Sequence, residues 1–125
     1  MKRKLSVLVL SFALLVCLYS CTKDRTAVPP AVVCTGIIDT DNTYNKNIGN
    51  ILNTYCGYAP CHDATSKQVG IEMDTYESTV AAFQSNNIIC AMTNAGCELM
   101  PKGGPQLDSI SLQQIKCWQV NGYKK

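Results

Sequence analysis

Apolar side chains recur at helical spacing in the stretch that begins at Thr43. They stand at positions i, i+4, i+7, i+8 and i+11, occupied by Tyr44, Ile48, Ile51, Leu52 and Tyr55. Such spacing places the side chains on one face of a helix. The pattern therefore predicts an amphipathic helix that runs directly into Cys56.

A second, shorter helix is indicated by a capping signal together with apolar spacing. Asp74 is followed three residues later by Glu77, which predicts the capped start of a helix. The apolar members of this helix are Tyr76, Val80 and Phe83.

The last predicted helix has signals at both ends. Ser111 and Gln114 have the spacing of a capping box. Ile110 and Ile115 have the spacing of a hydrophobic staple, and Gly122 is typical of a position just beyond a helix end. The apolar members are Leu112, Ile115, Cys117 and Trp118.

The connections between these helices are rich in Gly, Asn, Pro and Asp, and no stretch alternates convincingly as a strand would. We therefore expect an all-α fold of three to four short helices with long loops. The chain has 125 residues, of which 46% are hydrophobic, so it has room for one small domain. Its own apolar core is thin for such loops, and we expect disulfides or a large buried cofactor to support it.

The N-terminus has the features of a targeting segment. Three basic residues at positions 2–4 precede an apolar run over 5–18, which is too short to span a bilayer comfortably and favours a secretory signal peptide. The run ends in Leu18-Tyr19-Ser20-Cys21, which resembles the lipobox of bacterial lipoproteins. The resemblance implies that Cys21 receives diacylglycerol and an N-acyl chain, enough lipid for a stable anchor. The alternative is an ordinary signal peptide with an unrelated cysteine.

We accordingly divide the chain into a signal peptide (1–20), a lipidated N-terminus with a linker (21–33) and a domain (34–125). The protein is expected on the periplasmic or cell-surface face of a membrane. The formal charge is +2. It becomes −1 once the three basic residues of the signal peptide are removed, leaving eight Lys and Arg against nine Asp and Glu. Without a basic stretch, nucleic-acid binding is excluded as a working hypothesis.

The segment from Cys56 to His62 carries the most specific chemistry. Cys61 directly precedes His62, the only histidine of the chain, and Cys56 lies shortly before them. Two cysteines followed by histidine form the arrangement that attaches c-type haem through two thioethers. Four residues separate the cysteines here, where two are usual, and Gly57 and Pro60 can form the wider loop. A structural disulfide is the main alternative; a zinc site and a redox dithiol fit the spacing poorly.

The order of motifs resembles that of small cytochrome c domains, especially lipid-anchored bacterial ones. The resemblance covers about residues 43–123 and rests on Ile51–Cys56, Cys61–Asp63, Gly70–Ile71, Met100–Gly104, Leu107, Ile115–Trp118 and Gly122. It implies a cytochrome c-like fold around a haem site, covalent attachment through Cys56 and Cys61, and iron ligation by His62 and Met100. It also implies that the terminal helices, with Ile51, Leu52 and Trp118, pack against each other beside the haem.

The residues that follow Met100 in the sequence are also compatible with a role of its thioether as an iron ligand. Pro101 restricts the residue before it to extended geometry, and the following Gly103-Gly104-Pro105 forms a loop able to approach a flat ring. Filling of a core gap is the alternative role for Met100. Met92 is a weaker candidate for the same ligand position.

The remaining cysteines are even in number. Eight cysteines less Cys17 in the signal peptide and the lipidated Cys21 leave six, and removal of a haem-attaching pair leaves four. Four cysteines allow three pairings. Among these we favour Cys90–Cys97 and Cys34–Cys117.

These observations favour a lipid-anchored monohaem c-type cytochrome, an electron carrier rather than an enzyme. Redox proteins would be its partners through small transient contacts, and it would be monomeric. Two alternatives stay open: a haem-free, disulfide-stapled binding or structural module on the same fold, and a haem peroxidase whose distal position binds a small molecule.

Overall fold

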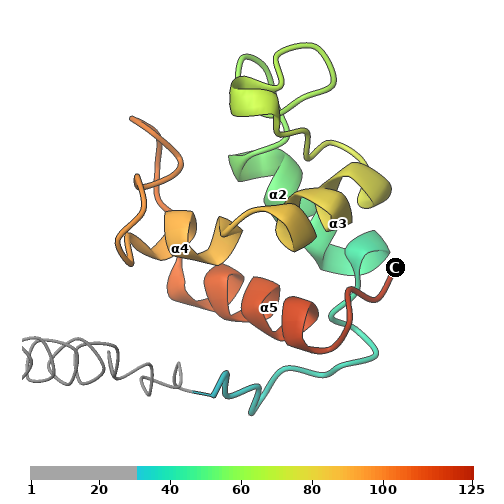
Figure 1. Cartoon of the computed structure of the whole chain (residues 1–125). Helices are drawn as coiled ribbons and strands as arrows, with labels where there is room; N and C mark the ends of the chain where they lie inside the picture. Colours follow the sequence, from blue (N-terminus) through green and yellow to red (C-terminus); the bar gives the residue numbers. More distant parts are fainter. Residues whose placement is uncertain (1–30) are drawn as a thin grey trace, which may run out of the picture. The chain divides into compact units, whose positions relative to one another are not determined.

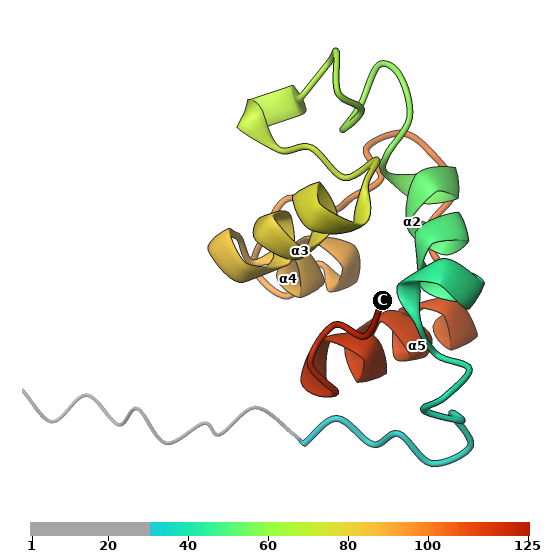
Figure 2. The ribbon, with the colours of Figure 1, turned by 90° about the vertical axis from the view of Figure 1, so that its right-hand side faces the viewer.

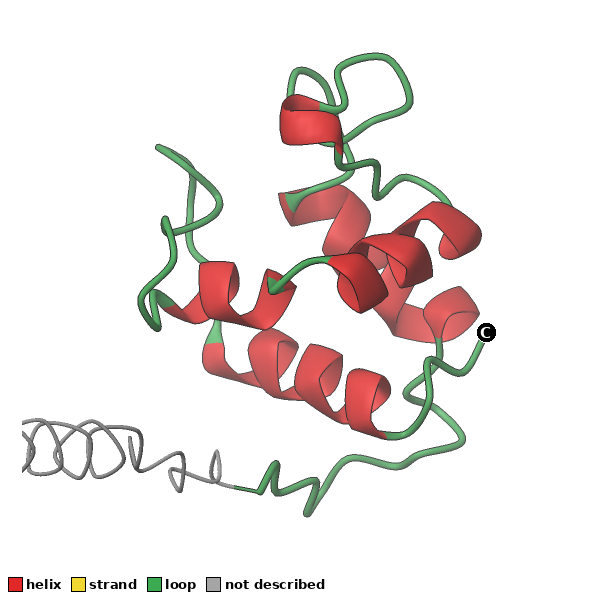
Figure 3. Ribbon diagram, in the orientation of Figure 1, coloured by secondary structure: helices red, strands yellow, loops and turns green. Residues whose placement is uncertain are grey.

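All regular elements of residues 31–125, the part that the computed structural model describes, are helical (Figures 1 and 3). They are the π-helical turn η1 (Tyr44–Ile48), α2 (Gly49–Tyr55), the 3₁₀ turn η2 (Gln68–Gly70), α3 (Tyr76–Ser85), α4 (Ile88–Thr93) and α5 (Ser109–Val120). The all-α prediction is confirmed. The predicted signal peptide, Cys17, Cys21 and most of the linker lie outside these residues. No helix within them is long and apolar enough to cross a membrane.

The helix predicted from Thr43 is present as η1 followed by α2. Ile48 and Leu52 have no exposed surface, and they carry the apolar face into the core. A Cβ at Gly49 would lie 2.9 Å from the Tyr44 carbonyl oxygen and 3.0 Å from its ring. Glycine therefore allows the Tyr44 side chain to lie against the next turn of the helix.

The cap predicted for α3 is shifted by one residue. Thr75 is the N-cap, and its side chain accepts a hydrogen bond from the Ser78 N–H while Ser78 Oγ accepts one from the Thr75 N–H. Asp74 is engaged elsewhere, because its Oδ2 accepts the N–H of Ala64 at 2.9 Å. It therefore ties the loop after α2 to the start of α3, and Glu77 completes no capping box.

The start predicted for α5 is three residues late. Asp108 is the N-cap, and its Oδ1 accepts the N–H groups of Ile110 and Ser111, both at 2.9 Å. Ser111 lies inside the first turn and donates its hydroxyl to Asp108 Oδ2 at 2.6 Å. Ile110 is 65% exposed, so the predicted staple is absent. The Asp108 carboxylate accepts two free N–H groups of the first turn, so it is a stronger cap than the predicted Ser111 hydroxyl.

The predicted end of α5 is confirmed. Gly122 has φ +83°, a conformation that glycine adopts without a steric penalty. The N–H of Tyr123 reaches the Trp118 carbonyl at 2.9 Å, and the N–H of Gly122 reaches that of Gln119 at 3.2 Å. This pair of bonds is the Schellman arrangement, which reverses the chain at a helix end. The C-terminal residues consequently return beside the first helix (Figures 1 and 2).

Trp118 is the centre of the core. Its ring lies 5.0 Å from that of Tyr123, 5.6 Å from Phe83 and 6.1 Å from Tyr44, between ring centroids. Its indole N–H donates to the Lys124 carbonyl at 2.8 Å, so the buried polar atom is satisfied. The aromatic cluster joins the first helix, α3, α5 and the C-terminal residues.

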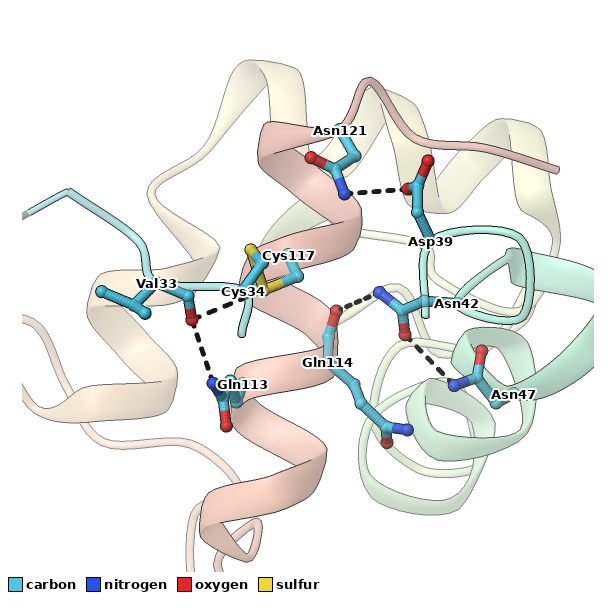
Figure 4. Close-up of a disulfide and its surroundings, with 9 residues drawn as sticks. All are labelled: Val33, Cys34, Asp39, Asn42, Asn47, Gln113, Gln114, Cys117 and Asn121. Carbon is cyan, nitrogen blue, oxygen red and sulfur yellow. Dashed lines mark hydrogen bonds between the residues drawn. A yellow bond between two sulfur atoms is a disulfide. The ribbon is translucent and has the colours of Figure 1, made fainter. Parts of the chain in front are cut away.

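Both favoured disulfides are present. Cys34–Cys117 joins the start of the domain to α5, with 5.7 Å between the Cα atoms (Figure 4). Nearby, Gln113 Nε2 donates to the Val33 carbonyl and Asn42 Nδ2 donates to the Gln114 carbonyl, each at 2.9 Å. Cys90–Cys97 joins α4 to the loop that follows it. The entrance segment is thereby fastened along α5.

Candidate functional site

A cavity of about 360 Å³ lies between the end of α2, the loop that follows it, α4 and residues 98–102. Its wall is mostly apolar, and its volume is within the range of small-molecule and cofactor sites. The side chains in it that can bind or bond to a cofactor are Cys56, Cys61, His62, Met73, Met92 and Met100. The structure thus brings together every haem-binding residue that the sequence suggests.

The wide loop between the two cysteines folds back on itself. The N–H of Cys61 donates to the Tyr58 carbonyl at 2.7 Å, and the N–H of His62 donates to the Cys56 carbonyl at 3.1 Å. The second bond brings the histidine directly to the end of α2. The four-residue gap is therefore compatible with a shared location of both sulfurs and the imidazole at one cavity. The Ala59–Pro60 bond in this loop is cis.

Gly57 is required in this loop for space rather than for a positive φ. A Cβ at this position would lie 2.5 Å from the Met73 carbonyl oxygen and 2.8 Å from Asn53 Oδ1. Both distances are shorter than real Cβ contacts. The loop after α2 therefore packs against the strand-like segment before α3, and no larger residue fits between them without a backbone shift.

Cys56 and Cys61 are the free cysteines of residues 31–125. Cys56 ends α2 and is 7% exposed, whereas Cys61 is half-buried. Burial, with a smaller contribution from the neighbouring Cys61, raises the pKa of Cys56 from 9.0 to about 12. Cys56 is accordingly a neutral thiol at physiological pH. The predicted alternative of a Cys56–Cys61 disulfide is not what the structure contains.

The imidazole of His62 is oriented by the backbone. Its Nδ1 lies 3.1 Å from the Ile71 carbonyl oxygen. Because a carbonyl only accepts, Nδ1 is the donor in this bond, and in the neutral ring the free lone pair is then on Nε2. A ring nitrogen fixed in this way by a backbone carbonyl is the usual support of a metal-binding histidine. The Met73 N–H donates to the His62 carbonyl at 2.7 Å, which holds the same segment in place.

Met100 also lines the cavity, from the loop between α4 and α5. It is half-buried, and its N–H donates to the Ala91 carbonyl at 3.0 Å. The Met100–Pro101 bond is cis, and the Pro101 carbonyl accepts a hydrogen bond from Gln106 Nε2 at 2.9 Å. Met92, on α4, is 7% exposed and also lines the cavity.

Two further residues of the site were not expected from the sequence. Met73 is 2% exposed and lines the cavity. The Ile71 carbonyl orients His62. Both lie at the site because the segment 63–73 folds back so that its end contacts His62. No local pattern of apolar residues predicts this reversal of the chain. The resemblance offered a partial signal, since Gly70–Ile71 was among its matching segments.

The rim of the cavity combines aromatic, apolar and charged side chains. Tyr58 is 40% exposed, and a hydrogen bond with Cys61 raises its pKa above the ordinary value. Val69 is 85% exposed and has φ +52°, which is rare for a β-branched residue. Lys102 forms an ion pair with Glu98 at 2.5 Å. One edge of the cavity thus faces solvent through residues of both signs of charge.

Within residues 31–125, no three His, Cys, Asp or Glu side chains are grouped as a set of metal ligands. Compared with models of protein families, with curated proteins and with solved structures, the chain matches none. The functional argument therefore rests on the cavity and its donor atoms.

Proposed function

We propose that this protein is a monohaem c-type cytochrome that accepts and passes single electrons at an extracytoplasmic membrane surface. The observation that carries the proposal is the convergence of Cys56, Cys61, His62 and Met100 on one apolar cavity, with the other described cysteines paired elsewhere. Two thiols, one imidazole nitrogen and one thioether are the donor set of a c-type haem.

The two thiols would hold the cofactor covalently. Each would add across one vinyl group, so that a carbon–sulfur bond forms and the thiol hydrogen moves to the neighbouring vinyl carbon. This addition consumes no oxidant or reductant, provided that both sulfurs are reduced. Cys56 and Cys61 meet that condition in the structure. The neutral state of the Cys56 thiol agrees with its apolar surroundings.

The remaining residues would bind and tune the iron. His62 offers Nε2, because its Nδ1 proton is committed to the Ile71 carbonyl. Met100 offers a soft thioether, which favours the reduced metal and raises the potential. Bound haem supplies the one-electron change of its iron. The wall of the site is mostly apolar, and the exposed edge near Tyr58 and Val69 is where a redox protein would come close.

The test of attachment compares chains matured with a cytochrome c maturation system. The wild-type protein is expected to gain the mass of one haem after denaturation and to give pyridine haemochrome bands. Cys56→Ser/Cys61→Ser should lose both signals. Cys90→Ser/Cys97→Ser removes the same number of sulfurs and should keep them. A wild-type chain without covalent haem would overturn the proposal and leave a haem-free module.

Ligation by Met100 has its own test. The oxidised protein should show a near-infrared sulfur-to-iron charge-transfer band that is lost in Met100→Ala. Met92→Leu is the matched control and should retain the band. Loss in Met92→Leu instead would assign the ligand to α4, and absence of the band from the wild-type protein would favour an open iron site, as in a peroxidase.

The anchor proposed at Cys21 is tested by fractionation. The wild-type protein should sediment with membranes, and Cys21→Ser should release it into the soluble fraction. Continued membrane association of Cys21→Ser would contradict the lipobox interpretation.

A further inference from the structure

The loop that carries Met100 is fastened to α4 at two adjacent points. The disulfide joins Cys97 to Cys90 on α4, with 5.6 Å between the Cα atoms. One residue further along the helix, the Ala91 carbonyl accepts the N–H of Met100 at 3.0 Å. The chain reverses between these elements at Asn94, which ends α4 in the left-handed conformation with φ 53°.

We propose that the Cys90–Cys97 disulfide is a positioning element that holds the Met100 thioether at the cavity. The inference rests on the proposed function, because it assigns to the disulfide a role in iron ligation. Neither sulfur lines the cavity. The bridge can therefore influence the site only through the residues that it holds.

Chain length limits how far Met100 can move from the bridge. Met100 is three positions beyond Cys97 in the sequence, and three extended residues span roughly 10 Å at most. Since Cys97 is fixed to α4, Met100 stays near the helix whose residues Ala91 and Met92 line the cavity. The segment from Cys97 to Met100 is shorter than the segment that the disulfide closes, in which Cys90 and Cys97 have a sequence separation of 7.

Other restraints on this segment are weak. Glu98 and Leu99 are exposed, so they contribute little packing. The ion pair between Glu98 and Lys102 joins side chains that are 62% and 74% exposed, and such surface pairs add little. His62, by contrast, is held by several backbone hydrogen bonds. The Met100 side is thus ordered mainly by the disulfide together with the one hydrogen bond from the Met100 N–H to the Ala91 carbonyl, whereas several hydrogen bonds order the histidine side.

Two insertions separate this role from a general effect on stability. Two glycines placed between Glu98 and Leu99 lengthen the tether from the bridge to Met100. The same two glycines placed between Ala95 and Gly96 lengthen only the loop that the disulfide closes. Both insertions are placed between exposed loop residues and replace no core residue and no cysteine. Cys90→Ala/Cys97→Ala removes the tie altogether.

The spectroscopic readout is the near-infrared band of the oxidised protein. The insertion after Glu98 and the double alanine variant should lose the band and lower the reduction potential, with the covalent haem content unchanged. The insertion after Ala95 should keep the wild-type band. Retention of the band in the variant with glycines after Glu98 would overturn the proposal, even if the double alanine variant fails to fold.

A second readout does not depend on haem. Hydrogen exchange at the Met100 amide, which is bonded to Ala91, should accelerate roughly tenfold or more with the insertion after Glu98 and stay near wild type with the insertion after Ala95. A wild-type protein without haem would refute the proposed function, and amide exchange would still decide whether the bridge orders Met100. Equal exchange in both insertions would refute the positioning role.

Discussion

The two sides of this domain are stabilised in different ways. On the side that we call the closed side, where α5 packs against the first helix, Ile48, Leu52, Ile115 and Trp118 have no exposed surface. The cavity side, formed by residues 56–73 and 91–102, surrounds a cavity of about 360 Å³ and exposes 85% of Val69. The closed side is stabilised by its own packing, whereas the cavity side consists mainly of loops whose sulfur and imidazole side chains line one cavity.

The difference indicates that one side of the domain supplies most of its stability and the other side contains the candidate site. The closed side contains the long-range disulfide and the aromatic cluster, so it supplies most of the stability. The cavity side can then keep the side chains of Cys61, His62 and Met100 only half-buried. Substitutions on the closed side should therefore change stability most, and those on the cavity side should change smaller, more specific properties.

Removal of the Cys34–Cys117 disulfide should have the largest effect. The bridge closes a loop with a sequence separation of 83 residues. Loss of such a constraint on the unfolded chain costs about 4.5 kcal/mol in the chain-entropy account. Urea unfolding of Cys34→Ala/Cys117→Ala measures it, with Cys90→Ala/Cys97→Ala as the short-loop comparison. Equal losses for the two bridges would contradict the division between the sides.

Trp118→Ala should destabilise the protein nearly as much, by about 3–5 kcal/mol, because the ring is fully buried among aromatic neighbours. The midpoint of urea unfolding is the measurement. Val120→Ala on the same helix is the control, since Val120 is 54% exposed and its truncation should cost less than about 0.5 kcal/mol. A loss below 1 kcal/mol for Trp118→Ala, on the order of a surface change, would show that the core lies elsewhere.

The Cys56 thiol should make stability depend on pH in the haem-free protein. Its pKa is about 12 in the folded chain against 9.0 ordinarily, so between these values the unfolded chain loses a proton that the folded chain keeps. Stability therefore falls as pH rises, by about 2 kcal/mol between pH 8.5 and 10.5.

The measurement is the free energy of unfolding at those two pH values for the wild type and Cys56→Ala, both produced without a haem maturation system. Because the other titrating groups are shared, the difference between the two slopes isolates the thiol. Parallel slopes would mean that Cys56 is not buried as the structure has it.

Gly57→Ala should cost roughly 1–3 kcal/mol, because the added Cβ meets the Met73 carbonyl and Asn53. Thermal unfolding checks it. Gly104→Ala is the control, since its Cβ would come no closer than 3.3 Å to Pro101. If both substitutions are equally mild, the loop after α2 is not packed against the segment before α3.

The sequence predicted the parts of the fold that are encoded locally. Apolar spacing located the helix from Thr43. The cysteine count left three pairings open, and the pairing that we favoured among them is the one in the structure. The start of α5 was wrong because Asp108 and Ser111 are both good caps, and only the carboxylate reaches two N–H groups. Helix α4 was not located, since its six residues are too few to show a period.

The candidate site was predictable to a different degree. Cys56, Cys61 and His62 are neighbours along the chain, so their placement at one cavity could be predicted without a fold. The place of Met73 could not, because it depends on the hydrogen bond from its N–H to His62. Gly57 was expected to help form the wide loop, but the sequence did not show that a side chain at this position would collide with the Met73 carbonyl. Such contacts between loops depend on the tertiary structure, so the local sequence does not predict them.

The covalent state of Cys56 and Cys61 in the matured protein is the most direct test of the haem proposal. Cleavage after Lys46 and Lys67 yields one peptide, residues 47–67, that contains both of these cysteines and no other. Mass spectrometry of this peptide from protein matured with haem should show the added mass of one haem. A peptide that is two hydrogens lighter than the reduced form, with its sulfurs bonded to each other, would contradict the account.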